Sequence, residues 1–375
     1  MRHIVHVTEC LAGGTLGVLT QAIAELAQIK VRQTLVYSRR PDTPADVKSL
    51  FPSGLRLIEL APAQGRNLEF ASKLYEELRA LVRDDPPDVV HLHSSKAGFV
   101  GRLALRALGS RAQILYSPHG LAFLNLHRPW SSAGCWILER LAGFVDCQPV
   151  SCGASEARML ATVTRRPAFV IENPVDPEFF NVARREAETP LVVMAGRICE
   201  QKAPEIFAEV SIRVRLEVPD ARFVWIGAGD AESEAMLHAV GVDVTGWLPQ
   251  SEVREWLARA SVYLQTSRWE GLPLSVLQAT AVGLPCVVLN AVGNRDAVVH
   301  QDTGYIGDST DDLSLFVTML LNNPALRLWV GRRARERAER RFTRERFRAA
   351  LLRLYQLDAE SHEPGHAVTT PATVS

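Results

Sequence analysis

Short apolar runs alternate with helix-length segments along most of this chain, and the whole pattern occurs twice. The first series of runs starts at His3–Val7 and the second starts at Leu191–Ala195. A charged, irregular stretch over residues 178–190 separates the two series and has the composition of a linker. Alternating strands and helices are typical of parallel sheets covered by helices. The sequence therefore predicts an α/β protein made of two similar units.

Nine runs carry this pattern. Those of the first series are His3–Val7, Leu35–Tyr37, Val89–Leu92, Ile114–Tyr116 and Phe169–Ile171, and those of the second are Leu191–Ala195, Phe223–Ile226, Val262–Leu264 and Cys286–Leu289. Both series open with a strand, a glycine-containing turn and a helix. Ligands of parallel α/β sheets bind beyond the carboxyl ends of the strands, so two facing units would enclose a cleft there.

The composition excludes several classes of protein. The 375 residues are 47% hydrophobic, which is enough for two cores. Because 42 basic residues balance 42 acidic ones, we expect no nucleic-acid partner that relies on bulk positive charge. The six cysteines form no C-x-x-C pair, so neither a zinc site nor a disulfide framework is indicated. With no signal-peptide pattern after Met1, we expect a cytoplasmic protein.

The stretch from Glu270 to Gln278 places a carboxylate and an amide on either side of a predicted helix start. Gly271 and Pro273 indicate a tight loop, and residues 275–283 read as a short apolar helix. The free N–H groups at such a helix start attract anions and polarised hydroxyls. Glu270 and Gln278 could therefore hold one polar ligand from two directions, which suits a sugar nucleotide.

Two cations follow the first strand of the second series. Arg197 and Lys202 lie between this strand and a predicted helix, where they could neutralise a diphosphate. Taken alone, they could equally be solvated loop charges.

A glycine pair follows the first strand of the chain. Gly13 and Gly14 could let the backbone approach a phosphate, although an ordinary tight turn explains them as well. The spacing is not G-x-G-x-x-G, but Arg39 and Arg40 could imitate a site for a 2′-phosphorylated dinucleotide. A dinucleotide-dependent oxidoreductase therefore stays open as an alternative.

Histidines lie at the ends of two predicted strands. His119 precedes Gly120, and its imidazole could enter the cleft or remain a core group. His91 and His93 alternate on one strand and face the same way, which resembles a metal pair. Because no Asp, Glu or Cys stands beside them with ligand spacing, we expect no metal site. A hydrogen-bonded structural role fits His91, and an acceptor-side role is open for His93.

Two segments could meet a membrane. Phe123, Trp130 and Trp136, with Arg128 and Arg140 nearby, could form an interfacial patch for a lipid-borne acceptor, or could pack within the domain. The segment from 327 to 353 carries 11 arginines and 3 glutamates. It could pack across both units, face anionic lipid, or form a solvated helical face with internal Glu–Arg pairs.

Taken together, these motifs resemble the retaining GT-B glycosyltransferases of glycosyltransferase family four, particularly the bacterial capsule, exopolysaccharide and O-antigen enzymes. The resemblance spans nearly the whole chain, and the motifs occur in the order found in the family. They are His91–Gly98, Ser117–Gly120, Glu172–Asp176, Gly196–Lys202, Ser267–Leu274 and Ala291–Asp296.

The resemblance implies a set of site residues. The catalytic residues would be His119, Arg197, Lys202 and Glu270, and the substrate-binding residues would be Gly13, Gly14, Lys96, Asn173, Gly246, Trp247, Leu248, Gly271, Leu272, Pro273, Leu274 and Gln278. In the family the two cations hold the donor diphosphate, the glutamate binds sugar hydroxyls, and the histidine contacts the sugar. The 246–248 loop would receive the nucleobase. The family has a second glutamate where this chain has Gln278, which keeps an acceptor oxygen but gives up charge.

The resemblance also implies a GT-B fold with two facing Rossmann-like domains and a cleft between them. An acceptor domain would cover residues 1–180 and a donor domain 181–342. A helix over 343–361 would cross back to the first domain, and a disordered tail would cover 362–375.

The activity implied is metal-independent, retaining transfer of a hexosyl group from a nucleotide diphosphate donor, most simply a UDP-sugar. The acceptor would be a glycan or lipid-linked glycan of bacterial surface polysaccharide synthesis, with no cofactor. The enzyme would lie in the cytoplasm and could associate peripherally with an anionic inner membrane face. A non-catalytic sugar-nucleotide-binding protein and a GT-B epimerase or hydrolase are the alternatives that use the same donor groups.

Overall fold

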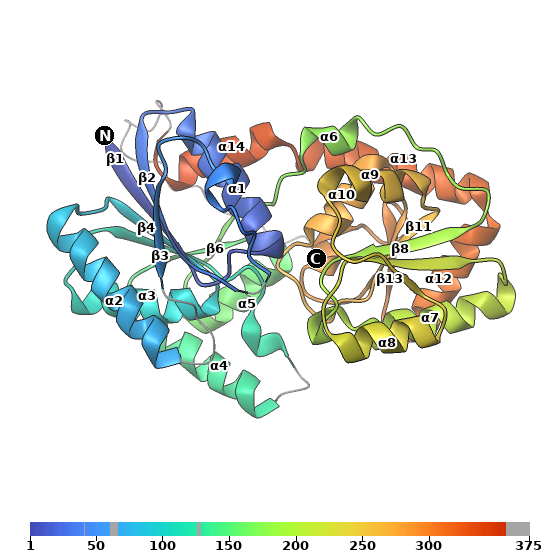
Figure 1. The fold of residues 1–375 in the computed structure, drawn as a ribbon, viewed down its shortest axis with the longest axis horizontal. Helices are drawn as coiled ribbons and strands as arrows, with labels where there is room; N and C mark the ends of the chain where they lie inside the picture. Colours follow the sequence, from blue (N-terminus) through green and yellow to red (C-terminus); the bar gives the residue numbers. More distant parts are fainter. Residues whose placement is uncertain (41, 61–66, 126–128, 358–375) are drawn as a thin grey trace, which may run out of the picture.

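The computed structural model describes residues 1–40, 42–60, 67–125 and 129–357 of the chain. Within them, two parallel β-sheets lie side by side with helices packed around each (Figure 1). The tail predicted over 362–375 lies outside the described residues, as does the end of the helix predicted over 343–361. The predicted α/β architecture with two similar units is confirmed.

The first sheet has seven strands in the order β3-β2-β1-β4-β5-β6-β7, and every pairing is parallel. Its strands are β1 (Arg2–Thr8), β2 (Val31–Ser38), β3 (Arg56–Leu60), β4 (Val89–His93), β5 (Gln113–Ser117), β6 (Gln148–Ser151) and β7 (Phe169–Val170). The helices of this half are α1 (Gly13–Ala27), α2 (Asn67–Asp84), α3 (Ser95–Ala107), α4 (Pro129–Ala142) and α5 (Ala154–Thr164), with short 3-10 turns η1 (Lys48–Leu50) and η2 (Ala122–Leu124).

The second sheet has six parallel strands in the order β10-β9-β8-β11-β12-β13. Its strands are β8 (Leu191–Ala195), β9 (Arg222–Ile226), β10 (Asp243–Val244), β11 (Val262–Gln265), β12 (Cys286–Leu289) and β13 (Gly304–Gly307). Around and beyond it come α6 (Pro177–Phe180), η3 (Glu200–Lys202), α7 (Pro204–Glu217), α8 (Ala231–Ala239), α9 (Gln250–Arg259), α10 (Leu274–Val282), α11 (Asn294–Ala297), α12 (Thr310–Asn322), α13 (Pro324–Arg341) and α14 (Arg344–Leu354).

The two sheets share one strand order, because the first six strands of each half follow the same sequence of crossovers. Four strands, β3, β6, β10 and β13, have no counterpart among the predicted apolar runs. Three of them are short: β10 has two residues, and β6 and β13 have four each. β6 also contains Pro149, and β13 begins and ends with glycine, so neither reads as a continuous apolar run.

The central strands are buried along most of their length because helices cover both faces of each sheet (Figure 1). β4 and β8 are buried along their whole length. In such sheets, continuous burial replaces the alternation seen in half-exposed strands. This is why runs such as Leu191–Ala195 could be recognised as strands in the sequence.

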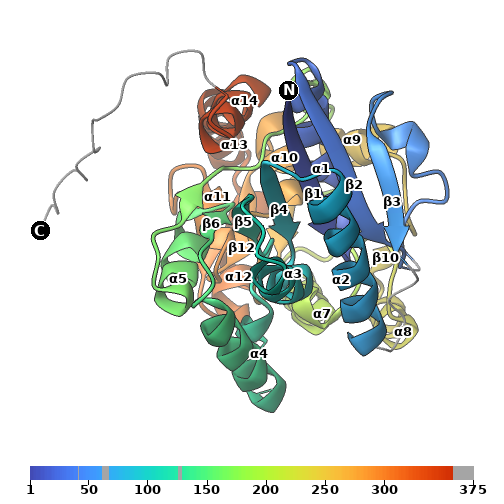
Figure 2. The ribbon, with the colours of Figure 1, turned by 90° about the vertical axis from the view of Figure 1, so that its left-hand side faces the viewer.

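The last helix returns to the first sheet, as the resemblance implied. Leu351 and Tyr355 join one buried cluster with Ile4 of β1 and Leu115 of β5. Figures 1 and 2 show α14 against the half that carries the N-terminus, while α13 runs along the other half. Arg344 adds an ion pair of 3.2 Å with the buried carboxylate of Glu25 on α1.

Most arginines of the 327–353 segment are held by groups of the chain itself. Arg327 pairs with Glu186 at 2.7 Å, and Arg341 pairs with Glu172 at 2.6 Å. Further pairs join this segment to Asp302 and Glu25. The segment thus packs across both halves and pairs with carboxylates of each.

Candidate active site

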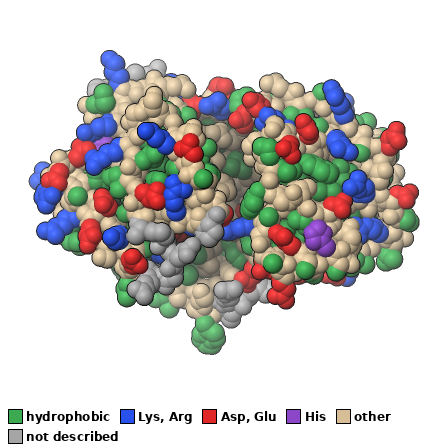
Figure 3. Space-filling view, in the orientation of Figure 1, with side chains coloured by type: hydrophobic (Ala, Val, Ile, Leu, Met, Phe, Trp, Pro, Cys, Tyr) green, Lys and Arg blue, Asp and Glu red, His purple; other side chains and the backbone are tan. Residues whose placement is uncertain are grey.

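Loops beyond the carboxyl ends of strands from both sheets meet between the two halves of the molecule. A Cβ built on Gly17, in the first turns of α1, would lie 3.2 Å from the side chain of Leu274. A Cβ built on Gly271, beyond β11, would lie 3.2 Å from the backbone nitrogen of Gly120, beyond β5. Figure 3 shows the surface hollowed along the boundary between the halves. Parallel α/β sheets bind ligands at this edge.

Lys202 and Glu270 form an ion pair on the second-sheet side of the groove. Lys202 Nζ lies 2.7 Å from Glu270 Oε1, and both side chains are largely buried. Gln265 Nε2 donates to the same oxygen at 3.2 Å, while Gln201 Nε2 lies 3.4 Å from Oε2. Gly196 has φ +145°, and a Cβ there would come within 3.1 Å of Lys202 Cε. The missing side chain at Gly196 gives the lysine its path to the glutamate.

Arg197 reaches across the groove to the other half. Its Nη1 lies 3.0 Å from Asp42 Oδ2, in the loop beyond β2, and its side chain is 40% exposed. Arg197 and Lys202 are therefore brought to the same edge of the second sheet, as expected. Asp42 was not anticipated, because its loop carries no ligand-binding motif.

Two helices begin at this junction without acidic caps. α1 starts at Gly13, and α10 starts at Leu274; neither has a side-chain cap or an acidic residue in its first turn. A Cβ on Gly13 or Gly14 would meet nothing within 4 Å, so the start of α1 borders open space. Because Gly17 packs against Leu274, both helix starts lie at one place. Their N–H groups give the groove two positive dipole ends.

Glu156, at the start of α5, is a buried carboxylate that the sequence analysis missed. Its oxygens accept from the backbone N–H groups of Gly120, at 2.8 Å, and Cys152, at 2.9 Å. Burial raises the pKa of Glu156 to about 7, and the nearby charge of Asp296 adds to the rise. Gly271 packs against it, since a Cβ there would lie 3.3 Å from Glu156 Oε1. The carboxylate thus fixes the turn after His119 at the contact between the halves.

Further polar contacts hold the Glu270 loop against the first half. Asn173 Nδ2 donates to the carbonyl of Leu272 at 2.8 Å. Ser155 Oγ donates to Asp296 Oδ2 at 2.6 Å and accepts from Gly293 N at 2.9 Å. Asn173, Gly271 and Leu272 therefore meet in the structure, although they are far apart in the sequence.

Gln278 lies beside the loop implied to receive a nucleobase. Its Nε2 is 3.3 Å from Oε1 of Gln250, the first residue of α9, and only Pro249 separates this helix from the loop of Gly246, Trp247 and Leu248. Trp247 is 59% exposed, whereas Leu248 packs on the apolar core under α10. Gly246 has φ +74° and open space where a Cβ would stand.

His119 belongs to a chain of hydrogen-bonded imidazoles. Its Nε2 lies 2.9 Å from His93 Nδ1, and His93 Nε2 lies 3.2 Å from His6 Nδ1. The other ring nitrogen of His119 lies 3.5 Å from Cys152 Sγ. Burial lowers the pKa of His6 and of His119 to about 4, so both are neutral near pH 7. Each neutral ring donates from one nitrogen and accepts at the other, so the tautomer of His119 is coupled to those of His93 and His6.

His91 takes the structural role expected for it. Its Nδ1 lies 2.6 Å from the Tyr355 hydroxyl of the returning C-terminal segment, and its Nε2 lies 2.8 Å from Ser117 Oγ. Ring nitrogens of His6, His91 and His93 all lie within 4.8 Å of one another, close enough to hold a metal ion. His6 was missed because it stands on a different strand. Both ring nitrogens of His91 and of His93 already have hydrogen-bond partners, which a metal would displace.

Lys96 and the Arg39–Arg40 pair have partners away from the Lys202–Glu270 pair. The ammonium of Lys96 lies 4.7 Å from the ring centre of Phe70, and burial lowers its pKa. Arg39 is held by Glu59 at 3.0 Å and by the carbonyl of Pro44 at 3.0 Å. Of the two arginines considered for a dinucleotide phosphate, Arg39 is therefore engaged by β3 and its own loop, while Arg40 Nε lies 3.5 Å from Asp42 Oδ1, whose other oxygen pairs with Arg197.

Both halves of the chain match models of known families. Residues 12–179 match the family described as Glycosyltransferase Family 4, and residues 189–323 match the one described as Glycosyl transferases group 1. Together the matches cover almost all of both sheets. The chain belongs to glycosyltransferase family 4. It is therefore a glycosyltransferase that takes a nucleotide-sugar donor, and its relatives include proteins of bacterial surface polysaccharide synthesis.

One relative of this glycosyltransferase is the Escherichia coli UDP-Gal:alpha-D-GlcNAc-diphosphoundecaprenol alpha-1,3-galactosyltransferase. It is 28% identical over 269 residues, which cover 65% of this chain and 68% of the relative. Among solved structures, the fold is similar to that of sucrose-phosphate synthase from Thermosynechococcus elongatus, with a TM-score of 0.82, 17% identity and coverage of 95% and 99%. Anabaena HepE in complex with UDP and glucose has a TM-score of 0.76, 13% identity and coverage of 95% and 100%.

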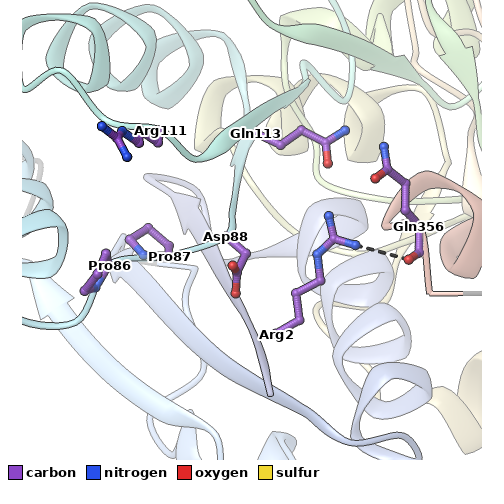
Figure 4. Close-up of a pocket in the computed structure, with 7 residues that line it drawn as sticks. All are labelled: Arg2, Pro86, Pro87, Asp88, Arg111, Gln113 and Gln356. Carbon is purple, nitrogen blue, oxygen red and sulfur yellow. Dashed lines mark hydrogen bonds between the residues drawn. The ribbon is translucent and has the colours of Figure 1, made fainter.

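A cavity of about 650 Å³ lies at the opposite end of the glycosyltransferase's first sheet (Figure 4). It is lined by Arg2 at the start of β1, Asp88 just before β4 and Gln113 at the start of β5. These are amino ends of parallel strands, away from the edge where such sheets bind ligands. Arg2 Nη1 donates to the Gln356 carbonyl at 3.1 Å, which ties this end to the returning C-terminal segment.

No single helix among the described residues of the glycosyltransferase is long and apolar enough to cross a membrane. The pair Thr310–Asn322 and Pro324–Leu354 passes by length and composition only when taken together, and it is bent by 108°.

The raised pKa of Glu156 makes stability depend on pH. The unfolded chain loses this proton near pH 4.5, whereas the folded protein holds it to about pH 7. The contribution of Glu156 to the free energy of unfolding is therefore largest below pH 4.5. It falls by about 3 kcal/mol in total as the pH rises from 4.5 to 7. We expect the thermal midpoint of the native protein to fall relative to that of Glu156→Gln between pH 5 and pH 7.5. Parallel pH profiles for the two proteins would contradict this pKa.

Proposed function

We propose that this glycosyltransferase moves a hexosyl group from a UDP-sugar to a lipid-linked glycan acceptor, with retention of anomeric configuration and without a metal ion. Its place would be bacterial surface polysaccharide synthesis at the inner face of the cell membrane. The observation that carries the proposal is the Lys202–Glu270 pair, with Arg197 beside it, facing the uncapped start of α1 across a groove.

The names of two similar proteins support the substrate classes. The Escherichia coli relative is named for UDP-Gal and for an acceptor attached to diphosphoundecaprenol. HepE was solved in complex with UDP and glucose. Trp247, exposed at the carboxyl end of the second sheet, offers a ring against which a uracil base can stack.

In the proposed mechanism, stabilisation of the leaving diphosphate lowers the barrier most. The bond from the anomeric carbon to the phosphate oxygen breaks, and the bond to the acceptor oxygen forms on the same face. The departing phosphate oxygen takes the acceptor proton. Arg197, Lys202 and the starts of α1 and α10 would hold the developing negative charge. On donor binding, Arg197 would break its ion pair with Asp42 and pair with the diphosphate.

Glu270 and His119 would position the sugar. The Glu270 carboxylate has Lys202 on one oxygen, and it can accept from sugar hydroxyls at its remaining lone pairs. His119 is neutral because burial lowers its pKa to about 4, so it would contribute shape and hydrogen bonding rather than charge. The positive charge at the site then comes from Arg197 and Lys202 alone among the residues proposed here.

Removing either cation should slow the chemical step. Loss of one donor that stabilises transition-state charge typically costs about 10²–10³-fold in rate, so we expect Arg197→Ala and Lys202→Ala to lose at least that much kcat. Steady-state assays with a UDP-sugar and a lipid-linked acceptor measure this. Arg332→Ala, at an exposed position of α13, is the matched control and should keep native turnover. Near-native kcat in both site variants would refute the assignment.

Turnover should not require a divalent cation. The charges assigned to the diphosphate come from Arg197, Lys202 and two helix starts, and no metal takes part in the scheme. We therefore expect unchanged initial rates after treatment with a chelator. Complete loss of activity, restored by one metal ion, would contradict the scheme and would direct attention to His6, His91 and His93.

A glutamate at position 278 should bind the UDP-sugar donor at least as tightly as the native Gln278 does. Charge-assisted hydrogen bonds are about twice as strong as neutral ones, so Gln278→Glu should leave the Kd for the UDP-sugar equal or lower. The change keeps the side-chain length, and Gln250 can turn its amide nitrogen toward the new carboxylate. Calorimetric titration gives the Kd. A collapse of affinity would mean that Gln278 belongs to a rebuilt site.

A further inference from the structure

Helix α4 buries polar side chains and exposes apolar ones, the reverse of an ordinary surface helix. Its inward stripe, at spacings of three and four residues, consists of Ser132, Cys135, Glu139 and Ala142, which are buried or half-buried. Glu139 is 3% exposed and binds the buried guanidinium of Arg102 at 2.6 Å. A surface helix normally buries its apolar stripe and exposes its charges. Here a carboxylate lies inside, and the large apolar side chains point outward.

Six large apolar side chains of α4 and the turn after it are exposed. We call them the α4 apolar face. They are Trp130 (88% exposed), Trp136 (41%), Ile137 (52%), Leu138 (42%), Leu141 (54%) and Phe144 (75%). In Figure 1, α4 projects at the lower edge of the molecule, and Figure 3 shows hydrophobic side chains protruding there. Single exposed apolar residues need no explanation, but a contiguous set marks a surface that another phase or molecule covers.

Part of the sequence interpretation is corrected by this arrangement. Phe123 is 8% exposed and packs in the core of the first half, so it is no part of the patch. Trp130 and Trp136, for which packing within the domain was an alternative, are exposed instead. Arg128 lies outside the described residues.

The exposed charges of α4 and of the segment that follows it through α5 are mainly basic. Between residues 129 and 166, the two glutamates, Glu139 and Glu156, are buried. The other charged residues are Arg140, Asp146, Arg158, Arg165 and Arg166, which give a net charge of 4 − 1 = +3. Asp146 is neutralised further by Arg166 at 2.6 Å.

Tryptophans flanked by arginines are typical of segments at a membrane interface. Trp136 carries the guanidinium of Arg140 at 6.0 Å from its ring centre. Such rings sit at headgroup level with their apolar bodies toward the acyl chains, while arginines reach anionic headgroups. An acidic protein partner would match only the arginines, and an apolar protein partner would match only the exposed apolar side chains. The arginines of 327–353, by contrast, are mostly paired with carboxylates of the chain.

We propose that the α4 apolar face inserts into the interface of an anionic lipid bilayer, with Arg140, Arg158 and Arg165 at the headgroups. α4 packs against η2, which begins three residues after His119, so this contact would hold the first half of the groove beside the bilayer. The purpose assigned to it, delivery of a lipid-linked acceptor, rests on the proposed function. Binding itself requires neither donor nor acceptor.

Co-sedimentation with vesicles tests the proposal on the purified full chain. Vesicles of phosphatidylcholine alone are compared with vesicles of equal parts phosphatidylcholine and phosphatidylglycerol, at low and high salt. We expect binding to the anionic vesicles that weakens with salt. The double variant Trp130→Ser/Phe144→Ser should bind at least about 10-fold more weakly, since it removes two large apolar side chains from the membrane interface. Leu216→Ser, which removes a side chain 80% exposed on α7 of the other half, is the control and should bind as the native chain does.

A charge variant and a solution measurement complete the test. Arg158→Glu/Arg165→Glu should lose binding to the anionic vesicles while keeping the native thermal midpoint. Native binding by both double variants, or no sedimentation with either vesicle, would overturn the proposal. So would a lipid-free dimer, seen by light scattering, that Trp130→Ser/Phe144→Ser converts to monomer, because the face would then bind a second copy. Vesicle binding in a chain that fails to bind any UDP-sugar would leave this inference standing and remove the proposed function.

Discussion

Backbone contact between the two halves, at Gly120 and Gly271, is the constraint on which the candidate site depends. A side chain at position 271 would press on the Gly120 amide, on His119 and on the buried Glu156 carboxylate. The same carboxylate accepts from the Gly120 and Cys152 amides. Because this contact is made between atoms with no rotamer freedom, it places the imidazole chain of the first half at a fixed position relative to the Lys202–Glu270 pair of the second.

The electrostatics of the groove follow from that placement. Arg197 and Lys202 are both paired with carboxylates, one from each half. In the proposed mechanism a donor diphosphate competes with Asp42 for Arg197, while Glu270 keeps Lys202 in place and turns its free lone pairs to the sugar. The ion pair that crosses between the halves is thus the one that donor binding would exchange. The histidines near this pair are neutral and add no charge, so the positive potential of the groove comes from Arg197, Lys202 and the two helix starts.

Local patterns in the sequence predicted the frame of the fold, and long-range contacts decided the rest. Buried strands such as Leu191–Ala195 and the helix after Pro273 could be recognised because continuous burial and glycine punctuation are local signals. Lys202 and Glu270 were placed at one site only through their position after two strands and through the family resemblance. Glu156, Asp42 and His6 were missed, since each acts through a partner at least 36 residues away in the sequence. The outward face of α4 was left open because its apolar residues occur nearly all round the helix, and only packing shows that Glu139 is the buried one.

The central claim is that the groove between the halves binds a nucleotide sugar as donor. A thermal-shift titration with UDP-glucose, UDP-galactose and other UDP-sugars, with NADP as the contrasting ligand, addresses it most directly, because a ligand that binds the folded protein raises the thermal midpoint by mass action. The account predicts a saturable rise with at least one UDP-sugar and none with NADP. A rise with NADP alone, or no rise with any nucleotide sugar at concentrations up to the millimolar range, would contradict it.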